Sequence, residues 1–227
     1  MKTPEHIVYV VDDDERVRES INDLLQSCGM VVAEFGSAAD YLKYEKPAIP
    51  ACLILDIELP DINGLELQRR LIGAPHPPIV FITGHGDIPA SVRAMKAGAI
   101  DFLPKPVTPA QLLATVEAAL ALDRERLAAE TEVKALRDRY NILTPREREV
   151  LPLVVLGLVN KQAAFSLGIS EVTYQIHRSS IMRKMAAPSL ADLVRMSIKL
   201  GIPTGNSGVS LKGTTPSRRN RETHPRT

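Results

Sequence analysis

The chain contains no tryptophan, and aromatic residues make up only 4% of its 227 residues. Its two cysteines, Cys28 and Cys52, form no CxxC or Cys/His pattern. This spacing argues against a disulfide framework or a thiolate metal centre, so we expect both to be reduced core residues. No apolar run reaches the length of about 18 residues that spans a membrane, and no basic segment leads into an apolar one near the start. We therefore expect a cytoplasmic protein with no membrane partner.

Charge is unevenly distributed along a chain long enough for two domains. Residues 1–122 carry 10 basic and 17 acidic residues, a net charge of −7. Residues 123–141 are balanced, whereas residues 142–200 and 201–227 each carry +4. A basic part that follows an acidic one indicates contact with a polyanion such as DNA. Because Gly, Ser, Thr, Pro and Arg dominate residues 201–227, we expect that segment to be a disordered tail.

The first 122 residues alternate short apolar runs with helical patterns. The runs are "HIVYVV", "VVAEF", "ACLILDI", "PPIVFIT" and "DFLP", and the helical patterns begin near Glu15, Ser37, Gly64, Pro89 and Thr108. Nearly continuous apolar strands separated by helices are typical of a parallel sheet covered on both faces. Residues 1–122 are therefore predicted to form a doubly wound α/β domain with a five-stranded parallel sheet.

The rest of the chain is predicted to be helical. No Pro or Gly interrupts residues 110–140, which favours one long helix whose second half, 123–141, links two domains. Residues 142–200 contain four short helical patterns. Thr144 and Glu147 form a capping box, and a Gly turn before Ser170 separates two of the helices. This order is typical of a helix-turn-helix domain.

Polar residues follow four of the predicted strands. Ligands of open parallel sheets lie beyond the carboxyl ends of the strands. Asp12, Asp13 and Asp14 follow the first strand. Asp56 ends the third strand, Thr83 follows the fourth and Lys105 follows the fifth. Carboxylates in this number suit Mg²⁺, and an ammonium group can balance their charge. We expect Asp14 to cap the following helix instead, because it lies nearest the start of that helix.

Residues 6–122 resemble the receiver domain of two-component response regulators. The matching motifs are "VVDDDE", "LILDIELPDINGLEL", "IVFITGHGD" and "AGAIDFLPKP". The resemblance implies the following roles: phosphoacceptor, Asp56; Mg²⁺ ligands, Asp12, Asp13, Asp56 and the Glu58 backbone carbonyl; switch residues, Thr83 and Phe102; active-site lysine, Lys105, with a cis bond to Pro106. It also implies phosphoryl transfer from a sensor histidine kinase, and no turnover of an external substrate.

The same resemblance implies that phosphorylation changes the face made by the fourth helix and fifth strand. Its apolar residues are Ile88, Val92, Met95 and Ile100. They are sufficiently apolar to join two receivers, although packing of the helix on the sheet would explain them as well. We expect a homodimer after phosphorylation.

The segment "LTPREREVLPLVVLGLVNKQAAFSLGISEVTYQIHRSSIMRKM" resembles the LuxR/NarL-type helix-turn-helix, and residues 6–200 together resemble the FixJ subfamily of response regulators. This implies a transcription regulator that binds double-stranded DNA and contacts RNA polymerase. Tyr174, His177, Ile181 and Met185 form an inward stripe of the recognition helix. The outward residues Gln175, Ile176 and Ser179 resemble base readers. Phosphate contacts are expected from Lys161, Arg178, Arg183 and Lys184.

Three residues depart from the family pattern. Pro152 lies within a predicted helix, where it removes one backbone hydrogen bond. Ala163 and Tyr174 stand where the family has a larger aliphatic residue and a compact valine. We expect these two side chains to touch, so that the small residue makes room for the large one.

Two other functions fit parts of the sequence. A phosphatase similar to haloacid dehalogenases would use Asp12 as nucleophile and Asp14 as acid, because "DDDE" contains an Asp-x-Asp spacing. It would lack the late acidic motif of that class. A DNA-binding protein independent of phosphorylation would use its receiver only as a scaffold for dimerisation.

Overall fold

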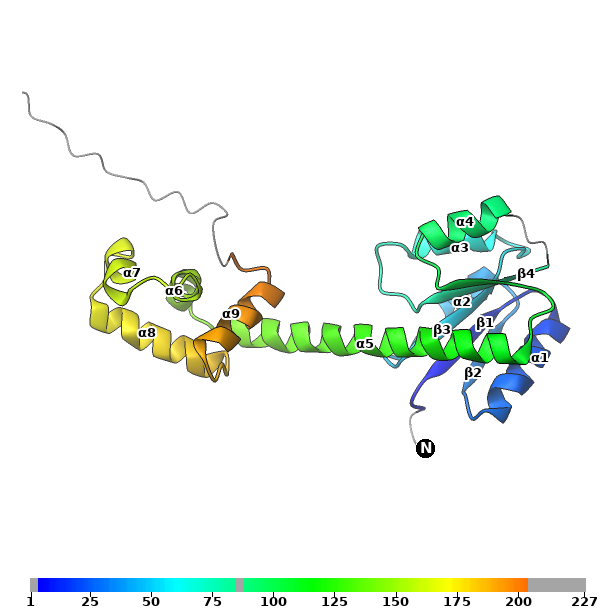
Figure 1. Cartoon of the computed structure of the whole chain (residues 1–227), viewed down its shortest axis with the longest axis horizontal. Coiled ribbons are helices and arrows are strands. Elements are labelled where there is room, and N and C mark those ends of the chain that lie inside the picture. Colours follow the sequence, from blue (N-terminus) through cyan, green and yellow to red (C-terminus); the bar gives the residue numbers. More distant parts are fainter. Residues whose placement is uncertain (1–3, 85–87, 204–227) are drawn as a thin grey trace, which may run out of the picture. The chain divides into compact units, whose positions relative to one another are not determined.

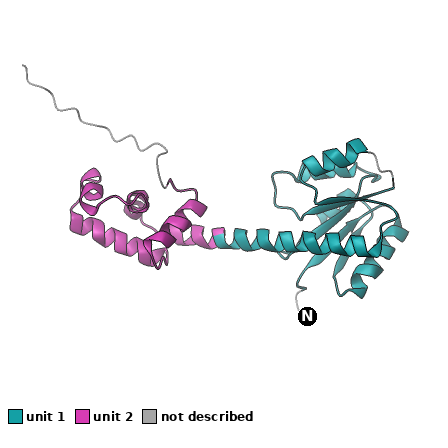
Figure 2. Cartoon of the chain, in the orientation of Figure 1, with its two compact units in different colours: residues 1–132 teal, residues 133–227 magenta. Residues whose placement is uncertain are grey.

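The computed structural model describes residues 4–84 and 88–203, which divide into two compact units. The units comprise residues 1–132 and 133–227 (Figure 2). The basic segment from residue 204 onward lies outside the described residues. Among the helices of the described part, none is both long and apolar enough to cross a membrane.

The first unit is built on the predicted parallel sheet (Figure 1). Its strands run in the order β2-β1-β3-β4-β5, and every neighbouring pair is parallel. The strands are β1 (Ile7–Val11), β2 (Val32–Phe35), β3 (Ala51–Asp56), β4 (Ile79–Thr83) and β5 (Asp101–Pro104). All five parallel strands end at one edge, where the first and third carry Asp12 and Asp56.

Helices cover both faces of the sheet (Figure 1). They are α1 (Glu15–Ser27), α2 (Ala38–Lys43), α3 (Gly64–Leu71), α4 (Ile88–Lys96) and α5 (Pro109–Asn141). One buried cluster joins the strands to α2, α3 and α4 through Tyr41, Leu67 and Ala94. The other joins them to α1 and α5 through Leu25 and Val116. The sheet is therefore buried on both sides, as its apolar strands predict.

Helix α5 is one continuous helix, as the absence of Pro and Gly predicts. Within the first unit it is fixed to the sheet by Asp123, whose buried carboxylate accepts a 2.9 Å hydrogen bond from the backbone N–H of Ala51 at the start of β3. Its other oxygen accepts a 2.8 Å hydrogen bond from Arg126. The buried charge is thus paired on both oxygens, which makes its burial tolerable.

The second unit contains the predicted short helices, α6 (Pro145–Val155), α7 (Asn160–Ser166), α8 (Glu171–Lys184) and α9 (Leu190–Lys199). The capping box of Thr144 and Glu147 begins α6. Pro152 lies inside α6, which continues to Val155. Between α7 and α8, Gly168 has a φ of +65°, a left-handed conformation that suits the turn.

Two of the residues that depart from the family pattern lie in the buried core of this unit. Ala163 on α7 and Tyr174 on α8 are both fully buried in one cluster. A small residue on one helix therefore accompanies a large residue on the next.

One prediction about the fold is wrong. Cys52 is buried as expected, but Cys28 is exposed. Cys28 follows the last residue of α1 as its C-cap. Cys28 belongs to neither of the two core clusters of the first unit.

Candidate functional site

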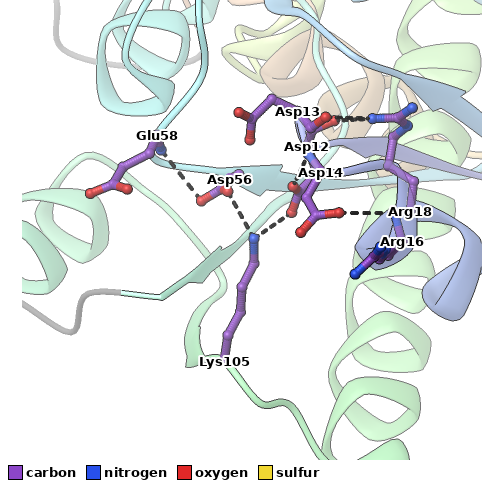
Figure 3. A network of polar contacts seen from close by, with 8 residues as sticks. All are labelled: Asp12, Asp13, Asp14, Arg16, Arg18, Asp56, Glu58 and Lys105. Carbon is purple, nitrogen blue, oxygen red and sulfur yellow. Dashed lines mark hydrogen bonds and ion pairs between the residues drawn. The ribbon is translucent and has the colours of Figure 1, made fainter.

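Three carboxylates converge at the carboxyl edge of the sheet (Figure 3). Asp12 follows β1, Asp56 ends β3, and Asp13 lies next to Asp12 in the loop. One oxygen atom from each lies within 4.8 Å of the others. Asp12 and Asp56 are buried, whereas Asp13 is exposed. Three hard oxygen donors at this separation fit Mg²⁺, with room for further ligands on the exposed side.

Lys105 from the loop after β5 reaches between the two buried carboxylates (Figure 3). Its Nζ lies 2.6 Å from Asp12 Oδ2 and 2.8 Å from Asp56 Oδ2. Burial lowers the pKa of Lys105, but the hydrogen bonds to both carboxylates outweigh this effect and the pKa is raised. Burial raises the pKa of Asp12, although the hydrogen bond from Lys105 opposes that shift. The ammonium group therefore offsets repulsion between Asp12 and Asp56. The peptide bond from Lys105 to Pro106 is cis, as expected.

Asp14 has the separate role that its position predicts. It is the N-cap of α1, and its carboxylate accepts a 2.9 Å hydrogen bond from the backbone N–H of Arg16. Arg18 also fixes this loop, since its Nη1 donates to the carbonyl oxygens of Asp12 and Asp13 at 2.8 and 3.0 Å. Sequence reasoning missed Arg18, because a lone arginine on a helix looks like a solvated surface residue.

The start of α3 approaches the end of β3 closely. A Cβ atom on Gly64 would lie 2.2 Å from the carbonyl oxygen of Asp56, so this position requires glycine. The backbone N–H of Gly64 donates a 2.8 Å hydrogen bond to the backbone carbonyl oxygen of Ile57. Nearby, the backbone N–H of Glu58 lies 3.3 Å from Asp56 Oδ1. These contacts hold the Asp56 carboxylate in place and leave Glu58 next to the acidic cluster (Figure 3).

The two expected switch residues lie on neighbouring strands. Thr83 ends β4 and is buried, while Phe102 on β5 is half-buried. The Phe102 ring packs against Phe81, with the ring centroids 6.4 Å apart. Thr83 and Phe102 thus lie on the fourth and fifth strands, where the motifs "IVFITGHGD" and "AGAIDFLPKP" predict them.

Three of the four residues expected to form a dimer face are exposed. On α4, Ile88 is 75% exposed, and Val92 and Met95 are also exposed. Ile100 is half-buried and packs against the cluster of α1 and α5, on the opposite side of the sheet. Ile100 therefore does not share the predicted face with the three α4 residues. It lies in the turn before β5, and its side chain packs on the other side of the sheet.

Helix α8 has a buried and an exposed side. Tyr174, Ile181 and Met185 are buried in the core, and His177 is half-buried, so the inward stripe is as predicted. The predicted base readers Gln175, Ile176 and Ser179 are exposed. They line one open hollow together with Val172, Ser180 and Arg183.

The four basic residues expected to contact phosphates differ in their surroundings. Lys161 and Arg183 are exposed. Arg178 is half-buried, and its Nη1 lies 3.4 Å from Asn160 Oδ1. Lys184 is only 24% exposed at its side chain and pairs with the buried Glu147 at 2.7 Å. Lys184 thus has a partner within its own domain, which the sequence pattern did not indicate.

Comparisons with known proteins agree with both units. Residues 8–117 match the response regulator receiver domain, and residues 141–197 match the luxR family of bacterial regulatory proteins. Nodulation protein W of Bradyrhizobium diazoefficiens is 48% identical over 202 residues, which cover 88% of this chain and 89% of that protein. The transcriptional regulatory protein FixJ of Azorhizobium caulinodans is 42% identical, over 86% of this chain and 93% of that protein.

A solved structure agrees as well. That of the response regulator StyR has a TM-score of 0.77 and 47% identity, and the match covers 86% of this chain and 99% of that one. FixJ and StyR are named as regulators, which leaves the phosphatase alternative without support. The chain belongs to the FixJ subfamily of response regulators, transcription regulators in which a receiver domain precedes a LuxR-type DNA-binding domain.

Proposed function

We propose that this regulator is activated by phosphoryl transfer from the phosphohistidine of a sensor kinase to the Asp56 carboxylate. The observation that carries the proposal is the contact of Lys105 with Asp56 at 2.8 Å beside two further carboxylates. In the transfer, an Asp56 oxygen forms a bond to phosphorus while the bond from phosphorus to the histidine nitrogen breaks. Lys105 neutralises charge on the transferred group, and the Thr83 hydroxyl donates a hydrogen bond to it.

Receiver domains bind Mg²⁺ at an acidic pocket, and the donor set here fits that ion. We assign Asp12, Asp13 and Asp56 as side-chain ligands and Glu58 as a ligand through its backbone carbonyl. When bound, Mg²⁺ supplies positive charge that stabilises the phosphoryl oxygens. Lys105 has a separate role, because its ammonium group bonds Asp12 and Asp56 directly.

Phosphorylation replaces a carboxylate by a group of about −1.5 to −2 charge. We propose that Thr83 and Phe102 respond to this charge and change the α4 face. Ile88, Val92 and Met95 then join two receivers in a homodimer. In the cytoplasm the dimer binds paired half-sites on DNA and contacts RNA polymerase. Loss of the phosphoryl group by hydrolysis returns the receiver to its initial state.

In the DNA-binding domain, Gln175, Ile176 and Ser179 read bases. Gln175 can bond the N6 and N7 edge of adenine, and Ile176 can contact a thymine methyl group. Lys161, Arg178 and Arg183 contact phosphates. We do not extend this role to Lys184, because its ammonium group already compensates the Glu147 carboxylate.

The decisive test of the phosphoacceptor is to treat the full chain with acetyl phosphate and Mg²⁺ and to map the label by peptide mass spectrometry. Label on Asp56, absent in Asp56→Asn, supports the proposal. Label on Asp12 would instead revive the phosphatase mechanism. An unlabelled protein that still binds DNA specifically would support regulation independent of phosphorylation.

A further inference from the structure

The exposed face of α8 begins one turn earlier than the predicted base readers. Val172 is 67% exposed and Ile176 is 63% exposed. Together with Gln175 and Ser179 they follow the spacing i, i+3, i+4 and i+7, which places all four on one face of a helix. They line the same open hollow of about 650 Å³. Two branched apolar side chains thus flank Gln175 on the face assigned to DNA.

We propose that Val172 and Ile176 act as a pair that reads two thymine methyl groups in each half-site. The inference rests on the proposed role of α8 as the recognition helix. Residues near the start of a recognition helix contact base edges in the major groove, and Val172 is the second residue of α8. Thymine alone presents a methyl group there.

The chemistry of the two side chains selects this ligand. Valine and isoleucine have no donor or acceptor, so against a guanine or cytosine edge they would leave polar base atoms without water and without a partner. Against a thymine methyl they bury apolar surface on both sides. The pair therefore favours thymine and also disfavours G·C pairs at the same positions.

Helix geometry sets the spacing of the two thymines. Residues four apart are separated by about 6 Å along a helix. Base pairs are about 3.4 Å apart, so the two methyl groups lie about two base steps apart when the helix follows the groove. Gln175 lies between Val172 and Ile176 in the sequence, lines the same hollow and can bond an adenine in the same stretch. The stretch of DNA that these three residues contact is therefore rich in A·T pairs.

Substitution of Val172 tests the contact without unfolding the helix. The N-terminal cap of α8 is made by Ser170, whose hydroxyl accepts a 3.0 Å hydrogen bond from the backbone N–H of Thr173. Val172 is not part of that cap, and alanine has a higher helix propensity than valine. The Val172→Ala chain should fold as the parent does, which circular dichroism can verify.

The experiment first selects a half-site from random duplexes with the full chain in acetyl phosphate and Mg²⁺. Each thymine is then replaced singly by deoxyuridine, which lacks only the methyl group. For the parent chain, two of these duplexes should bind about three- to fivefold more weakly. In Val172→Ala one of the two losses should vanish, and in Ile176→Ala the other should vanish. Ile142→Ala, at a 64% exposed position outside α8, is the matched control and should keep both losses.

The inference is overturned if the parent binds every deoxyuridine duplex as it binds the thymine duplex. It is also overturned if Val172→Ala keeps both losses. Failure of the proposed function gives a different pattern. If acetyl phosphate leaves DNA affinity unchanged while the methyl-dependent losses persist, control through Asp56 is wrong and the reading by Val172 and Ile176 stands.

Discussion

Lys105 donates a 2.8 Å hydrogen bond to Asp56, 49 residues away in the sequence. The same ammonium group lies 2.6 Å from Asp12, so one cation holds two buried carboxylates. The contact links the loop after β5 to the ends of β1 and β3. The contact orients the carboxylate of Asp56, the proposed phosphoacceptor, and balances its charge.

Replacing Lys105 by methionine should destabilise the receiver by about 2–3 kcal/mol, since two buried carboxylates would lose their shared cation. Added Mg²⁺ should restore part of this loss by binding only the folded state. Thermal unfolding with and without Mg²⁺ measures both effects. Lys96→Met, at an exposed position of α4, is the control. Equal melting temperatures for the parent and Lys105→Met would disprove the role of the contact.

Replacing Gly64 by alanine should displace the start of α3, because the added Cβ would lie 2.2 Å from the Asp56 carbonyl oxygen. We expect a loss of about 1–3 kcal/mol in unfolding free energy and slower labelling by acetyl phosphate. Gly36→Ala is the matched control, since its Cβ would meet only the Arg18 side chain at 3.7 Å. Normal labelling of Gly64→Ala would contradict the proposed rigidity of this junction.

The pair of Glu147 and Lys184 should make the DNA-binding domain sensitive to acid. Burial alone would raise the pKa of Glu147, but hydrogen bonds, above all from Lys184, lower it from 4.5 to about 2. A lowered pKa in the folded state stabilises the domain above pH 4.5, and this stability is lost as the pH falls toward 2.

Lys184 is partly exposed, so after screening the effect should be on the order of 1–2 kcal/mol. NMR signals of the DNA-binding domain in the full chain can follow its unfolding between pH 5 and pH 2. Glu147→Gln should show less of this dependence, with Glu149→Gln at an exposed position as control. An identical pH dependence in the parent and in Glu147→Gln would refute the assignment.

Ala163 and Tyr174 should be coupled in stability because both are buried in one core. Ala163→Ile alone should overpack the domain and destabilise it by about 1–3 kcal/mol. In the presence of Tyr174→Val the same change should cost less, which a double-mutant cycle of unfolding free energies measures. Strictly additive effects would show that the two side chains do not compensate each other.

The sequence predicts the receiver site well because parallel strands bring their ends to one edge. Asp12, Asp56 and Lys105 could be grouped from that rule alone, and Asp14 could be separated from them as a cap. The motifs then assigned the roles.

Contacts between distant surface-like residues could not be predicted. Lys184 looks like a phosphate contact in a basic helix, yet its partner Glu147 lies 37 residues earlier. Ile100 follows α4 so closely that the sequence predicts it on the same face, but the turn before β5 directs it to the other cluster. Cys28 was predicted to lie in the core, but α1 ends just before it and its side chain is exposed. The two errors, Ile100 and Cys28, concern residues whose direction depends on where the chain turns.

The most direct test of the account is the affinity of the full chain for its selected DNA with and without acetyl phosphate and Mg²⁺, measured in parallel for Asp56→Asn. We predict that phosphorylation tightens binding to paired half-sites at least tenfold, with a monomer-to-dimer change in sedimentation, and that Asp56→Asn shows neither effect. Equal affinity of the phosphorylated and unphosphorylated parent, or a full response in Asp56→Asn, would contradict the central claim.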